Sequence, residues 1–110
     1  MELLYKKCVP CEGGILPMNS GEAQKYMAEV TGWSLIDGKK IQKEFKFKDF
    51  KEVMVFVNKV ADLAESEGHH PDIFIHGWNK VRFELSTHAI GGLSENDFIM
   101  AAKIDSIKTF

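Results

Sequence analysis

The sequence predicts an α+β protein with a four-stranded antiparallel sheet and three helices on one face. Two segments alternate apolar and polar side chains with the period of a β-strand, and each belongs to a predicted hairpin. Three other segments repeat apolar side chains at the three- and four-residue spacing of a helix. The resulting order, α-β-β-α-β-β-α, is typical of helices packed against one antiparallel sheet.

The first half of the chain is predicted to contain an arm, a helix and a hairpin. Residues 1–18 are expected to form an irregular N-terminal arm, because prolines and glycines recur there. A helix is predicted over residues 22–31 with Ser20 as its N-cap. The hairpin turns at Asp37-Gly38. Lys43 interrupts the apolar face of the returning strand, which favours a position near a sheet edge.

The second half is predicted to contain a long helix, a second hairpin and a final helix. The long helix begins after Asp49, whose capping box is completed by Glu52, and it ends at Gly68. Apolar side chains follow along it at steps of three and four. Strands are predicted over residues 72–76 and 80–87, and the final helix follows them.

The bulk properties of the chain limit the classes of function. Its 110 residues fit one domain over 1–110, and its formal net charge of −2 lacks the basic excess expected for nucleic-acid binding. The apolar runs are too short for a membrane helix, and the N-terminus lacks the apolar region of a signal peptide. We therefore expect a cytoplasmic protein without a membrane or nucleic-acid partner. Its small size and open sheet edges favour a homodimer or homotetramer.

Three histidines carry the strongest chemical signal. His69 and His70 precede Pro71 at the exit of the long helix, and His88 follows the last strand. In a hairpin, the start of one strand lies beside the end of the other, so His88 is expected near the adjacent pair. Histidine titrates near neutral pH, which favours acid–base catalysis at this end of the sheet. The alternative is a polar helix exit with a turn fixed by Pro71.

A metal site is a further alternative at the same place. His69, His70, His88 and Asp97 could supply the four ligands that zinc prefers. However, adjacent side chains on an extended chain point to opposite faces, so His69 and His70 are poorly placed to share one ion. Metal-independent chemistry is therefore favoured.

The cysteines of the chain are Cys8 and Cys11, too few for a disulfide framework. A closed structural zinc site needs four ligands, and the chain has no second cysteine pair. Solvent-facing or loosely packed thiols are therefore favoured. A metal site shared with other ligands or another subunit, and a disulfide, remain open.

Three further residues have both a structural and a functional interpretation. Asp97 is predicted to complete a capping box with Ser94, and it could equally orient a histidine or a ligand. Glu65 is typical of a solvated helix residue. Trp78 is expected to pack against the protein or to stack on a planar ligand.

Together these residues resemble the signature of the pterin-4a-carbinolamine dehydratase family. The matching motifs are Glu65-x-x-x-His69-His70-Pro71, Trp78, Thr87-His88 and Gly92-Leu93-Ser94-x-x-Asp97. The resemblance covers most of the chain, although the stretch between Pro71 and Trp78 is one residue longer than in animal members. It implies four antiparallel strands with three helices on one face, and dimers that can pair into tetramers.

The resemblance also implies a reaction: dehydration of 4a-hydroxytetrahydropterin to quinonoid dihydropterin, without a metal or redox cofactor. Such a step recycles the pterin of aromatic amino-acid hydroxylases. His69, His70 and His88 would bind the substrate and transfer protons, because loss of water needs both an acid and a base. Asp97 would orient a histidine, and Glu65, Pro71 and Trp78 would support or bind the substrate. The second candidate is a non-catalytic dimerisation or coactivator-type protein of the same fold, a role that the animal member also has.

Overall fold

The computed structural model describes residues 2–10 and 16–107. Within these ranges the elements are η1 (Leu3–Tyr5), α1 (Ser20–Met27), β1 (Ser34–Ile36), β2 (Lys40–Lys46), α2 (Phe50–Glu67), β3 (Asp72–His76), β4 (Lys80–Leu85), η2 (His88–Ile90) and α3 (Glu95–Ile107). The predicted α+β class and element order are confirmed, with two short 3₁₀ helices, η1 and η2, in addition. None of the described helices combines the length and apolar character that crossing a membrane would require.

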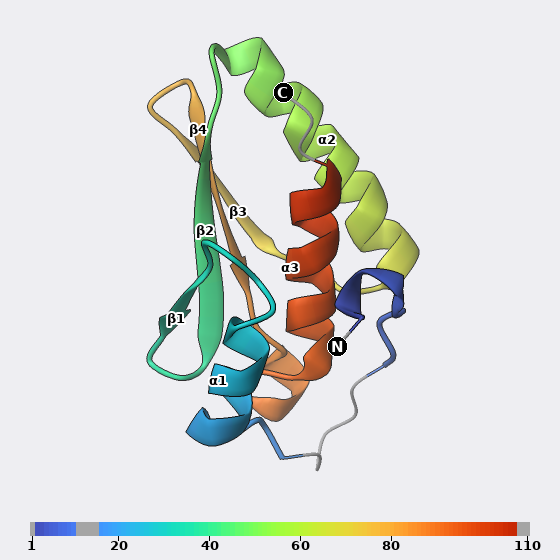
Figure 1. The fold of residues 1–110 in the computed structure, drawn as a ribbon. Coiled ribbons are helices and arrows are strands. Elements are labelled where there is room, and N and C mark those ends of the chain that lie inside the picture. The colour runs from blue at the N-terminus through green and yellow to red at the C-terminus, as the bar shows by residue number, and fades with distance from the viewer. Residues whose placement is uncertain (1, 11–15, 108–110) are drawn as a thin grey trace.

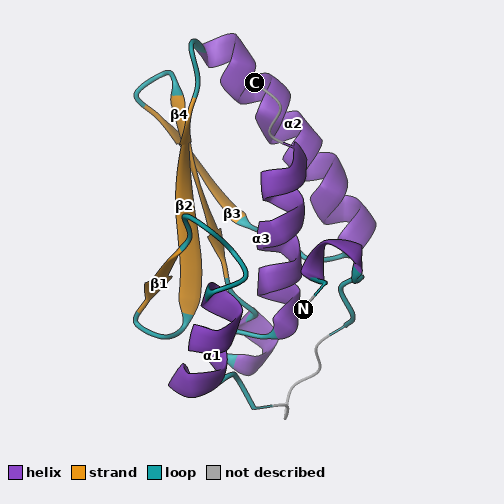
Figure 2. Cartoon of the chain, viewed as in Figure 1, coloured by secondary structure: helices purple, strands orange, loops and turns teal. Residues whose placement is uncertain are grey.

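The strands in the described part of the chain form one antiparallel sheet in the order β1-β2-β4-β3. The central strands β2 and β4 pair closely, with Ile41 opposite Leu85 and Phe45 opposite Val81. The helices α2 and α3 run along one face of this sheet, and α1 lies at one end of the same layer (Figure 1). Figure 2 shows the resulting two-layer arrangement of strands and helices.

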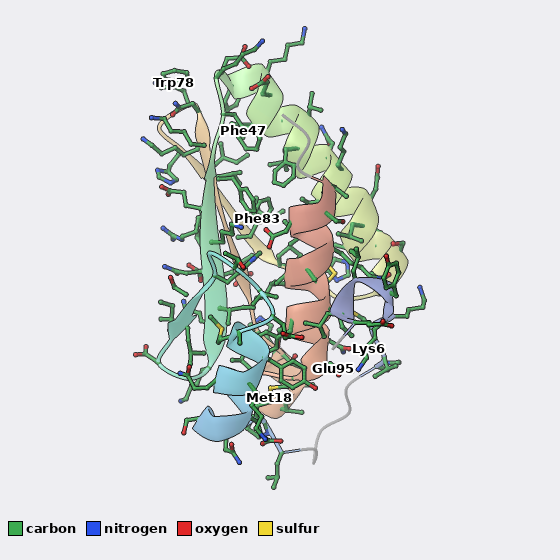
Figure 3. All side chains as sticks on the ribbon, viewed as in Figure 1. Lys6, Met18, Phe47, Trp78, Phe83 and Glu95 are labelled. Atoms are coloured by element: carbon green, nitrogen blue, oxygen red, sulfur yellow. The ribbon has the colours of Figure 1, made fainter. Side chains whose placement is uncertain are left out.

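The core lies between the two layers and is built on aromatic side chains. Phe56 of α2 packs against Phe45 of β2 and Phe83 of β4, with ring centroids 5.1 and 5.7 Å away. Phe47 and Phe83 point from the sheet toward the helices (Figure 3). Because aromatic side chains bury a large apolar area, these contacts hold α2 firmly on the sheet.

The N-cap of the first helix lies one residue earlier than predicted, and the helix begins at Ser20. Its N-cap is Asn19 rather than Ser20: the Asn19 side chain accepts a hydrogen bond from the Glu22 N–H at 2.9 Å, and the Glu22 carboxylate accepts one from the Asn19 N–H at 3.1 Å. This reciprocal capping box needs a carboxylate three residues after the cap, which Asn19 has and Ser20 lacks. The helix ends at Met27, earlier than expected.

Lys43 lies just beyond the part of β2 that pairs with the short edge strand β1, whose register ends at Gln42, as its expected position near a sheet edge predicts. Its strand β2 lies between β1 and β4. The Lys43 ammonium donates hydrogen bonds to the Asp105 carboxylate at 2.8 Å and to the Thr31 carbonyl at 3.1 Å. The strand β2 therefore tolerates this lysine on its apolar face because α3 supplies a counter-charge.

Residues 2–10 of the N-terminal arm pack against the rest of the protein, although an irregular arm was expected. Leu3 of η1 is buried, and Cys8 is only 8% exposed, so the expected solvent-facing thiol is wrong at this position. Burial, together with the nearby Glu67 carboxylate, raises the pKa of the Cys8 thiol to about 12. A thiol that stays protonated at neutral pH is a poor nucleophile and metal ligand. Cys11 lies outside the described residues.

Candidate active site

The three histidines line one open cavity of about 260 Å³, at the end of the sheet where β3 begins and β4 ends. The cavity is lined by Val9, Pro10, Gly68, His69, His70, Ser86, Thr87, His88, Ala89 and Asn96. The structure thus brings together residues from the arm, the exit of α2, the end of β4 and the start of α3. This is the juxtaposition that the hairpin geometry predicted for the histidines.

Local backbone geometry places each histidine at the cavity. Gly68 ends α2 in the left-handed conformation, with φ of +67°, and turns the chain so that His69 and His70 leave the helix axis. The strand predicted over residues 80–87 ends earlier, at Leu85, because His88 begins η2. Thr87 and Gly92 exchange main-chain hydrogen bonds at 2.8 and 3.4 Å, which closes the loop that carries His88.

His69 is held by a buried carboxylate. Its Nε2 lies 2.6 Å from Oδ1 of Asp97, whose side chain is fully buried. An ionised carboxylate can only accept hydrogen bonds, so Nε2 of His69 carries the proton in this pair. In a neutral ring, Nδ1 is then left as an acceptor. Asp97 thus fixes the tautomer of His69 as well as its orientation.

Asp97 is itself fixed by two further donors. Its Oδ2 accepts hydrogen bonds from the Thr87 hydroxyl at 2.9 Å and from the Ser94 N–H at 3.0 Å. The Ser94 hydroxyl lies 2.8 Å from Thr87 Oγ1. The carboxylate therefore joins the start of α3, the end of β4 and the histidine that follows α2.

His70 and His88 have more open surroundings. His70 Nε2 lies 2.5 Å from Oε2 of Glu65, but both side chains are largely exposed, so this pair is screened by solvent. His88 stands between the main cavity and a second one of about 250 Å³, which shares Ser86, Thr87 and His88 with it. Lys39 and Lys40 line the second cavity and give it a basic side.

The other predicted site residues lie outside the cavity lining. Glu65 contacts it through His70, and Pro71 follows the two histidines at the start of β3. Trp78 lies in the turn between β3 and β4, with its side chain 63% exposed. Figure 3 places Trp78 at the end of the molecule opposite Glu95, which begins α3 beside the cavity. The single chain therefore does not bring Trp78 to the histidines, because a hairpin turn lies a full strand length from the strands' other ends.

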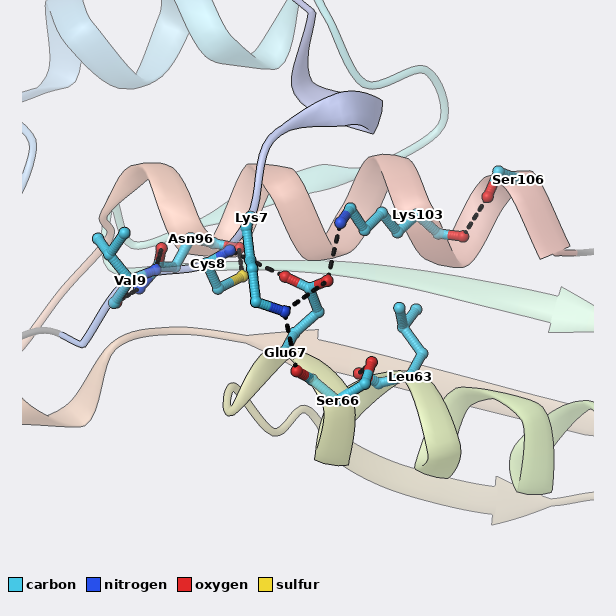
Figure 4. Close-up of polar contacts among 9 residues, drawn as sticks. All are labelled: Lys7, Cys8, Val9, Leu63, Ser66, Glu67, Asn96, Lys103 and Ser106. Atoms are coloured by element: carbon cyan, nitrogen blue, oxygen red, sulfur yellow. Dashed lines mark hydrogen bonds and ion pairs between the residues drawn. The ribbon is translucent and has the colours of Figure 1, made fainter.

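Sequence reasoning missed the contribution of the arm and of Asn96. Val9 and Pro10, which belong to the arm, line the cavity. Asn96 donates from Nδ2 to the Val9 carbonyl at 2.5 Å and accepts from the Val9 N–H at 3.0 Å (Figure 4). The one signal in the sequence for this contribution was the apolar character of Leu3 and Cys8, which is typical of a segment that packs against the rest of the protein.

Metal ligands are not clustered in the described part of the chain. No group of three or more His, Cys, Asp or Glu side chains within residues 2–10 and 16–107 is arranged to hold an ion. His69 and His70 bind different carboxylates, Asp97 and Glu65. Metal-independent chemistry stays a prediction.

Comparison with known proteins defines the class to which this fold and cavity belong. A sequence model described as "Pterin 4 alpha carbinolamine dehydratase" matches residues 16–107, a range that contains the sheet, the helices α1 to α3 and the three histidines. The chain belongs to the pterin-4a-carbinolamine dehydratase family, as its motifs predicted.

Particular relatives support this assignment. The chain is 51% identical over 106 residues to a Nitrosospira multiformis protein named "Putative pterin-4-alpha-carbinolamine dehydratase", covering 96% of this chain and 92% of the relative. It is 48% identical over 111 residues to "Pterin-4-alpha-carbinolamine dehydratase 2, mitochondrial" of Arabidopsis thaliana, covering 97% of this chain and 59% of that protein. Since that relative is named as mitochondrial, the expected cytoplasmic location stays a prediction.

A solved structure shares the fold. The crystal structure of a "transcriptional coactivator/pterin dehydratase" from Brucella melitensis superposes with a TM-score of 0.78 at 34% sequence identity. The match covers 84% of this chain and 99% of the Brucella chain.

Proposed function

We propose that the protein dehydrates 4a-hydroxytetrahydropterin to quinonoid dihydropterin and water by histidine acid–base catalysis, in the recycling of a tetrahydropterin. The observation that carries this proposal is the convergence of His69, His70 and His88 on one cavity in a chain of this family. The cavity volume of about 260 Å³ is close to the lower end, about 300 Å³, of typical small-molecule sites.

The reaction needs two proton transfers and no electron transfer to an external acceptor. The hydroxyl on C4a leaves as water after an acid donates a proton to it. A base removes the proton on N5, and the N5–H electron pair forms the new double bond between N5 and C4a. Imidazole is suited to both tasks near neutral pH, and each positioned group typically contributes about 10²–10⁴-fold.

The surroundings of the histidines fit different parts of this reaction. Asp97 binds the protonated Nε2 of His69, which leaves Nδ1 as a candidate acceptor for a substrate proton. His70 Nε2 lies 2.5 Å from the Glu65 carboxylate, which orients the His70 ring beside the cavity. His88 lines the same cavity from η2. Which histidine is the acid and which the base is left to experiment.

The test is the dehydration rate of purified protein, measured as formation of quinonoid dihydropterin above the unaided rate. Alanine variants of His69, His70 and His88 should each reduce the enzymatic acceleration by about 10²-fold or more. Double variants should lose less than the product of the single effects, because the groups act as a unit. Circular dichroism would confirm that each variant is folded.

His76→Ala is the matched control. His76 is the last residue of β3, at the end of the strand away from the cavity. Its side chain pairs with Glu44 on β2, and neither residue lines the cavity. Its removal should leave the rate nearly unchanged. Normal rates in both His69→Ala and His70→Ala would remove the catalytic assignment.

A non-catalytic binding role is the second candidate function. The name of the Brucella structure joins coactivator and dehydratase, and the apolar residues of β3 are exposed in this chain. A wild-type protein that forms a stable dimer but does not accelerate dehydration would favour this candidate. A functional link to an aromatic amino-acid hydroxylase would then be unsupported, because that link depends on recycling of the pterin.

A further inference from the structure

We propose that the N-terminal arm forms an apolar wall of the pterin site, and that Asn96 is the residue that positions this wall. The apolar wall consists of Val9 and Pro10. The inference rests on the proposed function and assigns a specificity-determining role to a segment that precedes the range matched by the family model, which begins at residue 16.

The apolar wall faces the cavity. Val9 and Pro10 line the same cavity as His69, His70 and His88. Val9 is apolar and 64% exposed, so its side chain lies outside the core. An exposed apolar side chain at the mouth of a polar pocket is suited to contact the flat face of a ligand.

Asn96 holds the wall by its main chain. The side-chain amide of Asn96 binds both main-chain groups of Val9, accepting from the N–H at 3.0 Å and donating to the carbonyl at 2.5 Å. Asn96 is 4% exposed, which makes this pair of contacts costly to break. A side-chain amide that bridges the N–H and C=O of one residue replaces the strand partner that an extended segment would otherwise need.

The arm is fixed on the other side of Val9 as well. The Cys8 N–H donates to Oε1 of Glu67 at 2.8 Å, and Lys103 donates to Oε2 of the same carboxylate at 2.8 Å (Figure 4). Lys6 pairs with Glu95 at 2.8 Å. The segment from Lys6 to Val9 is therefore attached to α2 and to the first turn of α3, so the wall has a fixed position.

The first turn of α3 supports both sides of the site. Asp97 orients His69, and the adjacent Asn96 orients Val9. A pterin bound between them would direct its polar edge and C4a to the imidazoles and the face of its other ring to the apolar wall. Contact with the part of the ring system remote from C4a changes little between the substrate and the transition state, so the wall should act on KM rather than on kcat.

The experiment compares kcat and KM for 4a-hydroxytetrahydropterin in Val9→Ala, Asn96→Ala and Asn96→Asp, with Val55→Ala as the control. Val55 is an exposed valine on α2 outside the cavity lining. Val9→Ala should raise KM about three- to tenfold, with kcat within about twofold of wild type. Asn96→Ala should raise KM at least as much, and Val55→Ala should change neither constant.

Two further readouts separate a positioning role from a general loss of stability. Asn96→Asp can still accept from the Val9 N–H but cannot donate to the Val9 carbonyl, so its KM should lie between those of wild type and Asn96→Ala. Hydrogen exchange at the Val9 amide should accelerate in Asn96→Ala and stay slow in Val55→Ala. Because the Val9 side chain is exposed, Val9→Ala should fold like wild type. It therefore tests the apolar wall even if Asn96→Ala folds poorly.

The outcomes distinguish the inference from the proposed function. An active wild type with KM unchanged in both Val9→Ala and Asn96→Ala overturns the apolar wall and leaves the dehydratase assignment intact. A fall in kcat without a change in KM for Val9→Ala overturns it too. A wild type that neither accelerates dehydration nor binds dihydrobiopterin in calorimetry overturns the proposed function, and the wall with it.

Discussion

The carboxylate of Asp97 connects the start of a helix with a histidine of the site. The sequence left two roles for it open, a helix cap and a histidine partner. It accepts from the Ser94 N–H through Oδ2, which is the capping role, and it contacts His69 through Oδ1. Since each oxygen has its own donor, one side chain fulfils both roles.

Replacing Asp97 by Asn tests how much the site depends on this carboxylate. An amide has one oxygen, so it can satisfy either His69 or the Thr87–Ser94 donors, and its NH₂ then faces a donor. We expect the free energy of unfolding to fall by about 1–3 kcal/mol and the dehydration rate by about 10²-fold. Urea unfolding and the pH–rate profile measure the two effects.

Ser94→Ala is the matched control for Asp97→Asn. It removes the hydroxyl next to Thr87 but keeps the main-chain N–H that binds Asp97. Its rate and pH profile should resemble those of wild type. An Asp97→Asn variant that is destabilised but retains the wild-type pH–rate profile would show that Asp97 acts only as a structural residue.

Some residues of the site are positioned by local hairpin geometry, and others are positioned by contacts between distant parts of the chain. The cluster of His69, His70 and His88 could be predicted, because hairpin geometry brings the start of one strand to the end of the other. Trp78 was expected at the site, yet it lies in the turn at the far end of the same hairpin. Val9 could not be predicted, because it reaches the cavity through contacts to Asn96, 87 residues along the chain.

At the scale of elements, the long helix α2 supports two functional segments at its C-terminal end. Gly68 redirects the chain into the histidine pair, and Glu67, the last helical residue, binds the arm. Burial opposes ionisation of Glu67, but hydrogen bonds from Lys103 and the Cys8 N–H outweigh it and hold the Glu67 pKa below its ordinary value of 4.5. The ionised carboxylate is therefore the form that attaches the arm.

The low pKa of Glu67 predicts a pH-dependent contribution to stability. A carboxyl group whose pKa is lower in the folded state binds its proton less readily there than in the unfolded chain. Its contribution is thus complete above pH 4.5 and is lost as the pH falls through the folded-state pKa. We expect Glu67→Gln to lower the free energy of unfolding by about 1.5–3 kcal/mol at pH 7, the range for hydrogen bonds to charged groups.

Urea unfolding of wild type and Glu67→Gln between pH 3 and pH 7 measures this contribution. The difference between the two proteins should shrink toward acid pH. Asp62→Asn, at an exposed position of the same helix, should show no such pH-dependent difference. A difference for Glu67→Gln that stays constant over this pH range would mean that the charge of Glu67 does not stabilise the arm.

The elements themselves show which part of the fold was predictable. Asp49 does cap α2, accepting from the Glu52 N–H at 2.8 Å, and both hairpins form as expected, because such signals lie within a few residues of each other. The arm lacks local signals of this kind. Its order depends on Glu67, Asn96 and Glu95, which come from distant helices, and a pattern of nearby residues does not record such contacts.

At the scale of the whole molecule, one edge of the sheet is both open and apolar. Among the described strands, β3 pairs with β4 on one side and lies at the end of the order β1-β2-β4-β3. Its residues Ile73, Phe74 and Ile75 are exposed. Edge strands of monomeric proteins are usually protected by charge, proline or a covering element. An apolar edge of this kind is typical of a surface that pairs with another chain.

We therefore expect the protein to form a homodimer or homotetramer that uses the β3 edge, and Ile75→Lys tests this assembly. Lysine on an edge strand opposes pairing with a second copy, so the dissociation constant should rise at least about tenfold, or about 1.4 kcal/mol. Sedimentation velocity over a concentration series measures it. Leu4→Lys, which places the same charge on η1 at another exposed apolar position, should assemble like wild type. A wild-type protein that is monomeric at micromolar concentration would refute the assembly itself. An unchanged dissociation constant in Ile75→Lys would show that the interface is not at the β3 edge, and the sheet face that the described helices leave uncovered would then be the next candidate.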